Sequence, residues 1–259
     1  MKPASETWVG LAETEKEDAD LSPAALETPS ATEPRSPTVT ARTGPNALIQ
    51  TGQALSALFG ENTARALFER AGLIDRYTTP PQAMLDEAEP RRLFTVLCDD
   101  LAPIESIQVL ADAGHRTGHY LLTRRIPKPA RWLLPRLPPG LSTRILVRAI
   151  AAHSWTFAGS GRFSGHVEAW RQPVVRLAIR SNPLATPGCP WHGAVFERLF
   201  ATLTASHVTV SHPRCSARGD DCCEWTIRPS AGPRPRARSF RKAGAGQPDR
   251  EDRRSPGSR

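Results

Sequence analysis

The chain has 259 residues, of which 34 are Lys or Arg and 26 are Asp or Glu, so its formal net charge is +8. No window of eighteen apolar residues occurs, which excludes a membrane-spanning helix, and the start Met1–Glu6 lacks the apolar run of a secretory leader. We therefore expect a cytoplasmic protein with reduced thiols. In that setting its five cysteines indicate a metal site or catalysis more often than a disulfide frame.

The two ends of the chain differ from the middle in charge. Residues 1–44 carry four basic and eight acidic side chains among many Thr, Ser and Pro, and residues 229–259 carry nine basic and three acidic ones. Neither end can bury enough apolar surface to offset its chain entropy. We expect two disordered tails, one acidic and one basic, around a single folded domain at 45–228. The basic tail should attract an anionic membrane face weakly and bind no specific nucleic acid.

The first part of this domain has the periodicity of α-helices. Apolar residues recur three and four positions apart in several stretches, with Gly60 and the pair Pro80–Pro81 as breaks. The prolines between Ile126 and Gly140 allow only short turns. We expect helices at about 48–59, 64–73, 91–101, 104–124 and 141–155, with a connection over 75–82.

At Gly159 the periodicity changes to that of strands. Residues 162–170 and 174–179 alternate or are rich in β-branched types, and two more short strands are expected at 208–211 and 224–228. An amphipathic helix at 191–205 lies between the two pairs. The order predicts an α+β fold with N-terminal helices followed by a β-β-α-β-β antiparallel sheet, its strands in a meander.

Four of the five cysteines fall between positions 189 and 223, around a polar loop that joins the last two strands. Thiolates and imidazole suit a tetrahedral Zn²⁺, and a hairpin tip can present them together with a neighbouring loop. We predict a metal site formed by Cys189, His212, Cys215 and Cys223. The spacing leaves two alternatives open: Cys222 could be the fourth ligand, or the cysteines could be buried core residues that bind no metal. Because neighbours on a strand point to opposite faces, one of the adjacent pair should be a buried strand residue.

Several segments of the chain resemble a known family. The loop from Cys215 to Cys222, with Ala217-Arg218-Gly219-Asp220 inside it and Glu224-Trp225 after it, resembles the ending of the 4-vinyl reductase domain. The upstream runs Thr43–Gln50 and Ala113–Tyr120 are similar to those of the bacteriochlorophyll-synthesis branch of that family. The resemblance covers about residues 43–228. It implies a ligand-binding fold related to haem-based nitric-oxide sensors and to vesicle-tethering subunits.

The resemblance also implies a bound metal. Phenol-sensing regulators of the same superfamily hold a zinc on three cysteines and a carboxylate around this hairpin, and Cys189, Cys215 and Cys223 match those cysteine positions. His212 occupies the carboxylate position, which leaves tetrahedral binding available. A zinc with four protein ligands is structural rather than catalytic.

For function, the resemblance implies reduction of the 8-vinyl (4-vinyl) group of divinyl protochlorophyllide or chlorophyllide. This reduction needs two electrons, which side chains cannot readily supply. The glycine pattern Gly159–Gly165 leads into a strand, whereas a dinucleotide site needs a helix there, and no C-x2-C-x2-C run for an iron–sulfur cluster occurs. An oxidoreductase acting on this CH–CH group would therefore need an external electron donor. Two alternatives stay open: a non-catalytic carrier that delivers the tetrapyrrole to a separate 8-vinyl reductase, and a small-molecule sensor or scaffold.

Given the resemblance, the expected ligand is a large, flat, anionic magnesium tetrapyrrole. His115 and His119 stand four apart, hence on one face of a predicted helix, and can offer a nitrogen to the Mg²⁺, although an ordinary helix surface explains them as well. Arginines after this helix can meet the propionate of the pigment. The candidate pigment-binding residues are His115, His119, Arg124, Arg125, His153 and Trp155.

Three tryptophans, Trp132, Trp155 and Trp170, are consistent either with the lining of a ring-shaped cavity or with an ordinary core. The partners implied by the family are divinyl chlorophyllide, other bacteriochlorophyll-synthesis enzymes and, because related domains pair, a second copy of the chain. A cytoplasmic protein with such partners is expected at the periphery of the photosynthetic membrane.

Overall fold

The computed structural model describes residues 41–204 and 207–230. Both predicted disordered tails, including the basic one predicted to contact a membrane, fall outside the described residues, apart from the few positions next to the folded domain. At the N-terminal edge, the chain before residue 45 already belongs to the fold. Strand β1 (Arg42–Thr43) pairs with β2 (Leu85–Asp86), and the N–H of Gly44 donates to the carbonyl of Thr156 at 2.7 Å.

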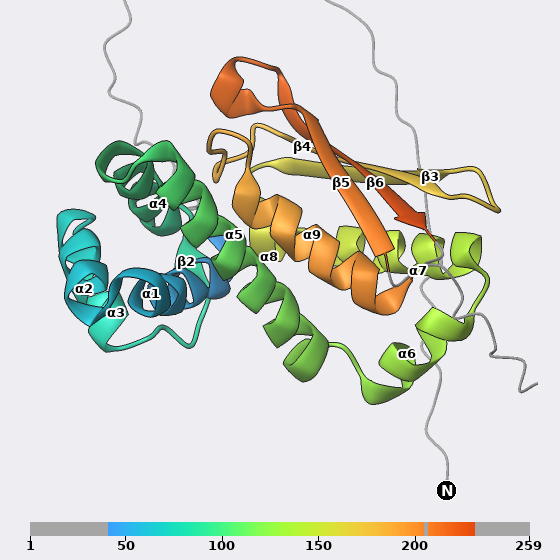
Figure 1. The fold of residues 1–259 in the computed structure, drawn as a ribbon, viewed down its shortest axis with the longest axis horizontal. Coiled ribbons are helices and arrows are strands. Elements are labelled where there is room, and N and C mark those ends of the chain that lie inside the picture. The colour runs from blue at the N-terminus through green and yellow to red at the C-terminus, as the bar shows by residue number, and fades with distance from the viewer. Residues whose placement is uncertain (1–40, 205–206, 231–259) are drawn as a thin grey trace, which may run out of the picture. The chain divides into compact units, whose positions relative to one another are not determined.

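The helices follow the predicted order (Figure 1). Their bounds are α1 (Asn46–Phe59), α2 (Glu61–Arg70), α3 (Ile74–Thr78), α4 (Ala88–Asp100), α5 (Pro103–Tyr120), the π-helical turn η1 (Leu121–Arg125), α6 (Lys128–Leu133), the 3₁₀ turn η2 (Leu134–Arg136), α7 (Pro139–Ala152), α8 (Trp155–Ala158) and α9 (Pro190–Leu203). The expectation of a plain connection over 75–82 is wrong for its first half. Tyr77 in α3 packs on Phe68 and hydrogen-bonds Ser56, and these contacts stabilise one helical turn before Pro80.

Helices α5 and α9 lie side by side and pack closely (Figure 1). A Cβ on Gly114 would stand 2.3 Å from the carbonyl oxygen of Trp191, and a Cβ on Gly118 would stand 2.7 Å from Cβ of Arg198. Only glycine allows this approach, so one face of α5 is used for packing. The histidines of the same run, His115 and His119, are exposed on other sides of the helix.

The main sheet contains β3 (Arg162–Glu168), β4 (Val174–Arg180), β5 (His207–Arg214) and β6 (Cys222–Ser230). All its neighbouring strands are antiparallel, which confirms the α+β prediction. The predicted meander is wrong, because the strand order is β3-β4-β6-β5. The connection through α9 carries the chain past the neighbouring position to the sheet edge, and β6 then returns to pair with β4.

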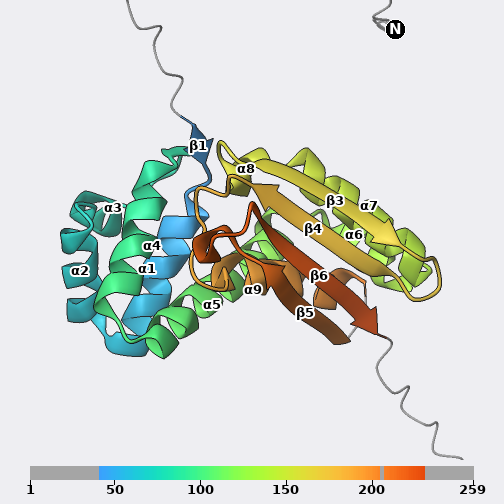
Figure 2. The ribbon, with the colours of Figure 1, turned by 90° about the horizontal axis from the view of Figure 1, so that it is seen from above.

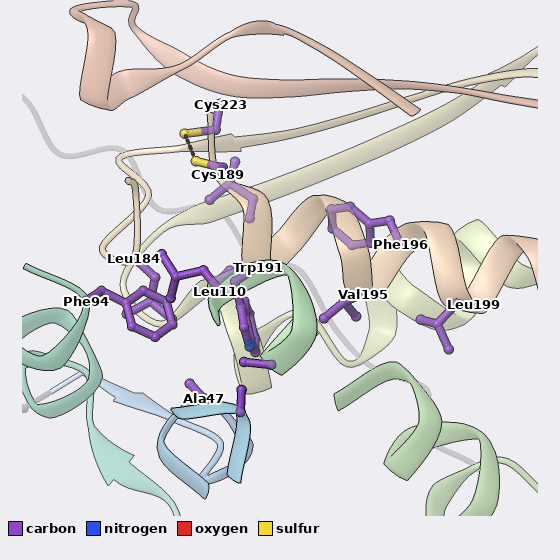
Figure 3. Packing of buried hydrophobic residues seen from close by; sticks show 14 of the residues in the cluster. Ala47, Phe94, Leu110, Leu184, Cys189, Trp191, Val195, Phe196, Leu199 and Cys223 are labelled. Atoms are coloured by element: carbon purple, nitrogen blue, oxygen red, sulfur yellow. Dashed lines mark hydrogen bonds between the residues drawn. The ribbon is translucent and has the colours of Figure 1, made fainter. Parts of the chain in front are cut away.

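The core lies between this sheet and its covering helices, α7 against β3 and α9 against β5 and β6 (Figure 2). Alternate residues of the two central strands face inward and are fully buried: Val175, Leu177, Ile179, Cys223, Trp225 and Ile227. From α9, Trp191, Phe196 and Leu199 pack in the same cluster (Figure 3). The described part of the chain contains no helix long and apolar enough to cross a bilayer.

Candidate metal centre and ligand groove

Four predicted ligands meet where the β5–β6 hairpin contacts the start of α9. One ligand atom from each of Cys189, His212, Cys215 and Cys223 lies within 4.8 Å of all the others. Sγ of Cys189 stands 3.4 Å from Sγ of Cys223 and 3.7 Å from Sγ of Cys215. Cys189 and Cys223 point toward each other from α9 and the sheet (Figure 3). The three thiols are buried, so the arrangement can hold a metal ion out of contact with bulk water.

Local backbone features aim these side chains. Cys189 caps α9 in the left-handed conformation, with φ 43°, which is uncommon for a residue with a Cβ and is often found at functional sites. In β5, the register shifts between Ser211 and Arg214, so that His212 and Pro213 lie opposite Trp225. Such a bulge re-aims a side chain. Cys215 follows directly after this strand, at the hairpin tip.

The sulfur spacing fits a tetrahedral ion. Zn–S bonds of about 2.3 Å place two sulfurs about 3.8 Å apart in a tetrahedron. The separations here are 3.7 Å and 3.4 Å, whereas a disulfide would need about 2.05 Å. The imidazole of His212 fits as well. Its Nδ1 donates to the carbonyl of Glu224 at 2.8 Å, which leaves Nε2 as the nitrogen with a lone pair. Nε2 is buried and has no hydrogen-bond partner among the described residues.

The surroundings of Cys223 favour a thiolate. Nδ2 of Asn182 and the backbone N–H of Ser216 each donate to its Sγ at 3.4 Å. The hydrogen bond with Cys189, followed by those with Ser216 and Asn182, lowers the pKa of the Cys223 thiol despite its burial. The same contact, together with burial, raises the pKa of Cys189. A thiolate is the form that ligates a metal.

Cys222, the alternative fourth ligand, lies outside the group of four. It precedes Cys223 on β6 and therefore points to the opposite face of the sheet. Burial raises the pKa of the Cys222 thiol, which opposes ligation. The geometry thus selects His212 over Cys222.

His192, a buried residue beside the candidate metal centre, has no distinguishing pattern in the sequence. Its ring lies 4.9 Å from that of Trp191 and 5.4 Å from that of Trp225, and neither ring nitrogen has a hydrogen-bond partner in the described structure. Burial lowers the pKa of His192 to about 3, against the opposing effect of the Phe157 backbone. His192 therefore stays neutral at physiological pH. Asn182 was missed as well, because a lone Asn in a loop resembles a turn residue.

A groove of about 580 Å³ runs along α5 and brings together three of the six pigment-binding candidates. His115, His119 and Arg124 line it, together with Arg198 of α9, which the sequence did not suggest. A second groove of about 560 Å³ adjoins it, since Gln53 and Arg116 line both. The second groove is the more apolar of the two, with its lining drawn from α1, α2 and α3: Leu48, Ile49, Ala57, Phe68 and Tyr77 among others.

The other candidates lie elsewhere. Arg125 is exposed and stands over the ring of Tyr120 at 5.8 Å, while His153 ends α7 with its Nδ1 bonded to the carbonyl of Ala149. Trp155 is 56% exposed on α8. Trp132 and Trp170 are 62% and 52% exposed, so the alternative that the three tryptophans belong to an ordinary core is wrong. Among the described residues, no layer covers the short elements that carry these tryptophans.

Comparison with known proteins gives two close relatives. The chain is 41% identical over 199 residues to the bacteriochlorophyll synthase 23 kDa chain of Cereibacter sphaeroides, covering 74% of this chain and 93% of the relative. It is 36% identical over 192 residues to the protein of the same name from Rhodobacter capsulatus, covering 73% and 87%. No family model matches the sequence.

Among solved structures, the fold is similar to that of a mutant H-NOX protein from S. oneidensis in the Fe(II) ligation state. The TM-score is 0.50 at 14% identity, and the match covers 73% of this chain and 98% of that one. At this identity the likeness concerns the fold alone.

Proposed function

Because the chain belongs to the family of the bacteriochlorophyll synthase 23 kDa chains, we propose that it takes part in bacteriochlorophyll biosynthesis by binding a magnesium tetrapyrrole in the paired grooves beside α5. The observation that carries this proposal is the juxtaposition of an apolar groove and a basic, histidine-bearing one. A chlorophyllide needs both kinds of surface, since its macrocycle is apolar and its propionate is anionic.

The basic groove supplies the polar contacts. His115 and His119 are separated by one helical turn, so either imidazole can offer a nitrogen to the central Mg²⁺. Arg124 and Arg198 form no ion pair with any described carboxylate and are available for the propionate. Arg116 is already bonded to Asp112 at 2.7 Å. The volume, about 580 Å³, lies in the usual range of ligand sites.

The apolar groove would cover one side of the ring. Its aromatic residues, Phe68 and Tyr77, pack on each other with centroids 4.9 Å apart, and Gly52 lets both rings lie against α1, since a Cβ there would stand 3.3 Å from Tyr77 and 3.4 Å from Phe68. Aromatic and aliphatic walls are typical of sites for planar ligands. In this groove they alternate with polar lining residues: Gln53, Ser56, Glu61, Arg76 and Arg116.

For the metal centre we propose a structural Zn²⁺ held by Cys189, Cys215, Cys223 and His212. Soft thiolates with one imidazole are a zinc donor set, and four protein ligands leave no open position for substrate. The zinc would tie the β5–β6 hairpin to the loop before α9. Its role is to stabilise this end of the sheet, and the pigment grooves lie on the helical side.

Within biosynthesis, the proposed step is reduction of the 8-vinyl group, with this chain presenting the divinyl pigment and an external donor supplying the electrons. The glycine-containing turn before β3 is a poor nucleotide site, because the carboxylate of Glu87 accepts from both N–H and Oγ–H of Ser160 at 2.6 Å. A phosphate there would meet this carboxylate. The carrier alternative shares the same groove and differs only in whether reduction occurs on this protein.

The test is a titration of the purified protein with divinyl chlorophyllide, followed by absorption. We expect a shifted pigment band for the wild type and at least tenfold weaker binding for the double variant His115→Ala/His119→Ala. The matched control is His166→Ala/His207→Ala, which changes two exposed histidines of the sheet, outside the groove, and should bind as the wild type does.

Addition of reduced nicotinamide then separates reduction from carriage. Loss of the vinyl group supports a reductase, and a shifted band without loss supports a carrier. An unshifted band in the wild type, or equal weakening in both double variants, would contradict binding in this groove.

A further inference from the structure

We propose that the surface formed by α6, η2, the outer side of α7 and the turn between β3 and β4, here called the α6–α7 face, docks on an anionic lipid bilayer. The face is defined by seven exposed residues: Trp132, Leu133, Arg136, Arg144, Ile145, Arg148 and Trp170. The proposal concerns a different part of the molecule from the pigment grooves and the metal centre.

The charge of this region has one sign. Between Asp112 and Glu168 the sequence contains nine Lys or Arg residues and no Asp or Glu, and Glu168 itself, at the end of β3, is paired with Arg176 at 2.8 Å. In the described structure, none of the three arginines of the face forms an ion pair with a carboxylate. Basic side chains whose charge is not neutralised by a carboxylate each add to the attraction of an anionic membrane. The face therefore complements a negatively charged bilayer.

The aromatic residues of the face carry arginines on their rings. The guanidinium of Arg136 stands 4.3 Å from the ring centre of Trp132, and that of Arg144 stands 4.8 Å from that of Trp170. Both tryptophans are more than half exposed. Trp and Arg together suit the headgroup level of a bilayer, where an indole sits between water and hydrocarbon while the cation meets phosphate.

Packing holds these groups in place. A Cβ on Gly140 would stand 2.3 Å from the carbonyl oxygen of Trp170, so the β3–β4 turn lies directly against the first turn of α7. Arg144 donates to the carbonyls of Gly140 and Ala169 and links the two. Further along α7, Ile145 and Arg148 are exposed beside it, at the spacing that keeps them on one side of a helix.

The exposed aliphatic residues favour lipid over nucleic acid. Leu133 and Ile145 are 47% and 42% exposed, and a hydrated polyanion would leave them in water. A bilayer interface removes apolar surface from water, which is favourable in proportion to the area buried. A membrane therefore explains why exposed apolar side chains lie among basic ones, and a nucleic-acid backbone does not.

The experiment measures binding of the full chain to vesicles of phosphatidylglycerol and phosphatidylcholine, and to vesicles of phosphatidylcholine alone. We expect binding to the anionic vesicles only, weakened by salt, with tryptophan fluorescence quenched by lipids brominated on their chains. Trp132→Ala/Trp170→Ala should lose most of the quenching, and Arg144→Ala/Arg148→Ala should bind at least tenfold more weakly.

Two controls match these variants. Leu58→Ala/Ile104→Ala removes exposed apolar residues elsewhere, and Arg65→Ala/Arg92→Ala removes the same charge from α2 and α4. Both should bind as the wild type does. All variants keep the C-terminal basic residues. If the variants in the α6–α7 face bound vesicles as well as the control variants do, the attraction would come from the overall positive charge of the chain, and the proposal would be overturned. Tight binding to single-stranded DNA that the tryptophan variants abolish would overturn the choice of lipid.

Discussion

The imidazole of His212 is stacked on the indole of Trp225, with ring centroids 4.8 Å apart and planes inclined by 26°. The same imidazole donates from Nδ1 to the carbonyl of Glu224, so two successive residues of β6 orient it. Its Nε2 therefore has a fixed direction before any metal arrives. A ligand already ordered by the protein lowers the entropic cost of binding.

The adjacent cysteines of β6 provide a matched pair for the zinc proposal. Cys223→Ser removes a ligand from the group of four, whereas Cys222→Ser changes a residue on the other face of the sheet. Metal analysis of the purified proteins should find about one zinc per chain in the wild type and in Cys222→Ser, and strongly reduced zinc in Cys223→Ser. Equal zinc in the two variants would exclude Cys223 as a ligand, and Cys215→Ser repeats the test at the hairpin tip.

Asn182 tests the surroundings of the ligands. Its Nδ2 donates to Sγ of Cys223, while its Oδ1 accepts from the N–H of Leu184 at 3.1 Å. Asn182→Asp keeps the acceptor and loses the donor, and it adds a negative charge beside the thiolates. We expect zinc affinity, measured by competition with a chelator, to fall about 10–100-fold. Unchanged affinity with an unchanged fold would show that this N–H···S contact does not support the site.

His192 makes the stability of the fold depend on pH. Its pKa is about 3 in the folded state against 6.5 ordinarily, so below pH 6.5 the unfolded chain takes up a proton that the folded chain does not. The stability due to neutral His192 is therefore complete above pH 6.5 and is lost as the pH falls toward 3. Between pH 7.5 and 5 the loss is of the order of 2 kcal/mol.

His192→Phe keeps an aromatic ring in this position and removes the titration. Urea unfolding with saturating zinc should show a smaller loss of stability between pH 7.5 and 5 in the variant than in the wild type. Zinc release on acidification contributes to both proteins, so the difference between them reports His192. Parallel pH profiles would mean that the imidazole titrates normally.

The glycines of α5 and α9 allow a test of the helix contact. Gly114→Ala would place a methyl group against the backbone of Trp191, which cannot move without shifting α9, and we expect a loss of about 1–3 kcal/mol. In Gly193→Ala on α9, the nearest atom is Nε1 of Trp225 at 3.8 Å. There the gain in helix propensity, up to about 1 kcal/mol, should dominate. Urea unfolding measures both, and equal effects would show that α5 and α9 are less closely packed.

Local patterns predicted most of the elements, because their physical causes are local. The change from helical to strand periodicity at Gly159 lies three residues before β3, and the run Pro190–Leu203 forms the expected amphipathic helix. The order of the strands in the sheet could not be predicted from local patterns. It depends on which edge of the sheet the chain reaches after α9, and antiparallel hairpins have similar local sequences in either arrangement.

The same distinction between local patterns and distant contacts applies to the residues of the candidate sites. The cysteines with His212 were found from residue type and from their position around one hairpin. His192, Asn182 and Arg198 act through neighbours distant in sequence, and nothing in their own segments marks them. The tryptophans were misjudged because a large aromatic residue is a core former in most contexts, while exposure depends on the absence of a covering layer.

The strand order also has a consequence for how the protein is made. The last of the four proposed ligands, Cys223, lies on β6, which is both the final strand of the sheet and the one inserted between β4 and β5. Until the ribosome has synthesised that segment, the nascent chain has neither a complete sheet nor a complete ligand set. If the proposed zinc binds, ion capture and closure of the sheet both wait for this last strand.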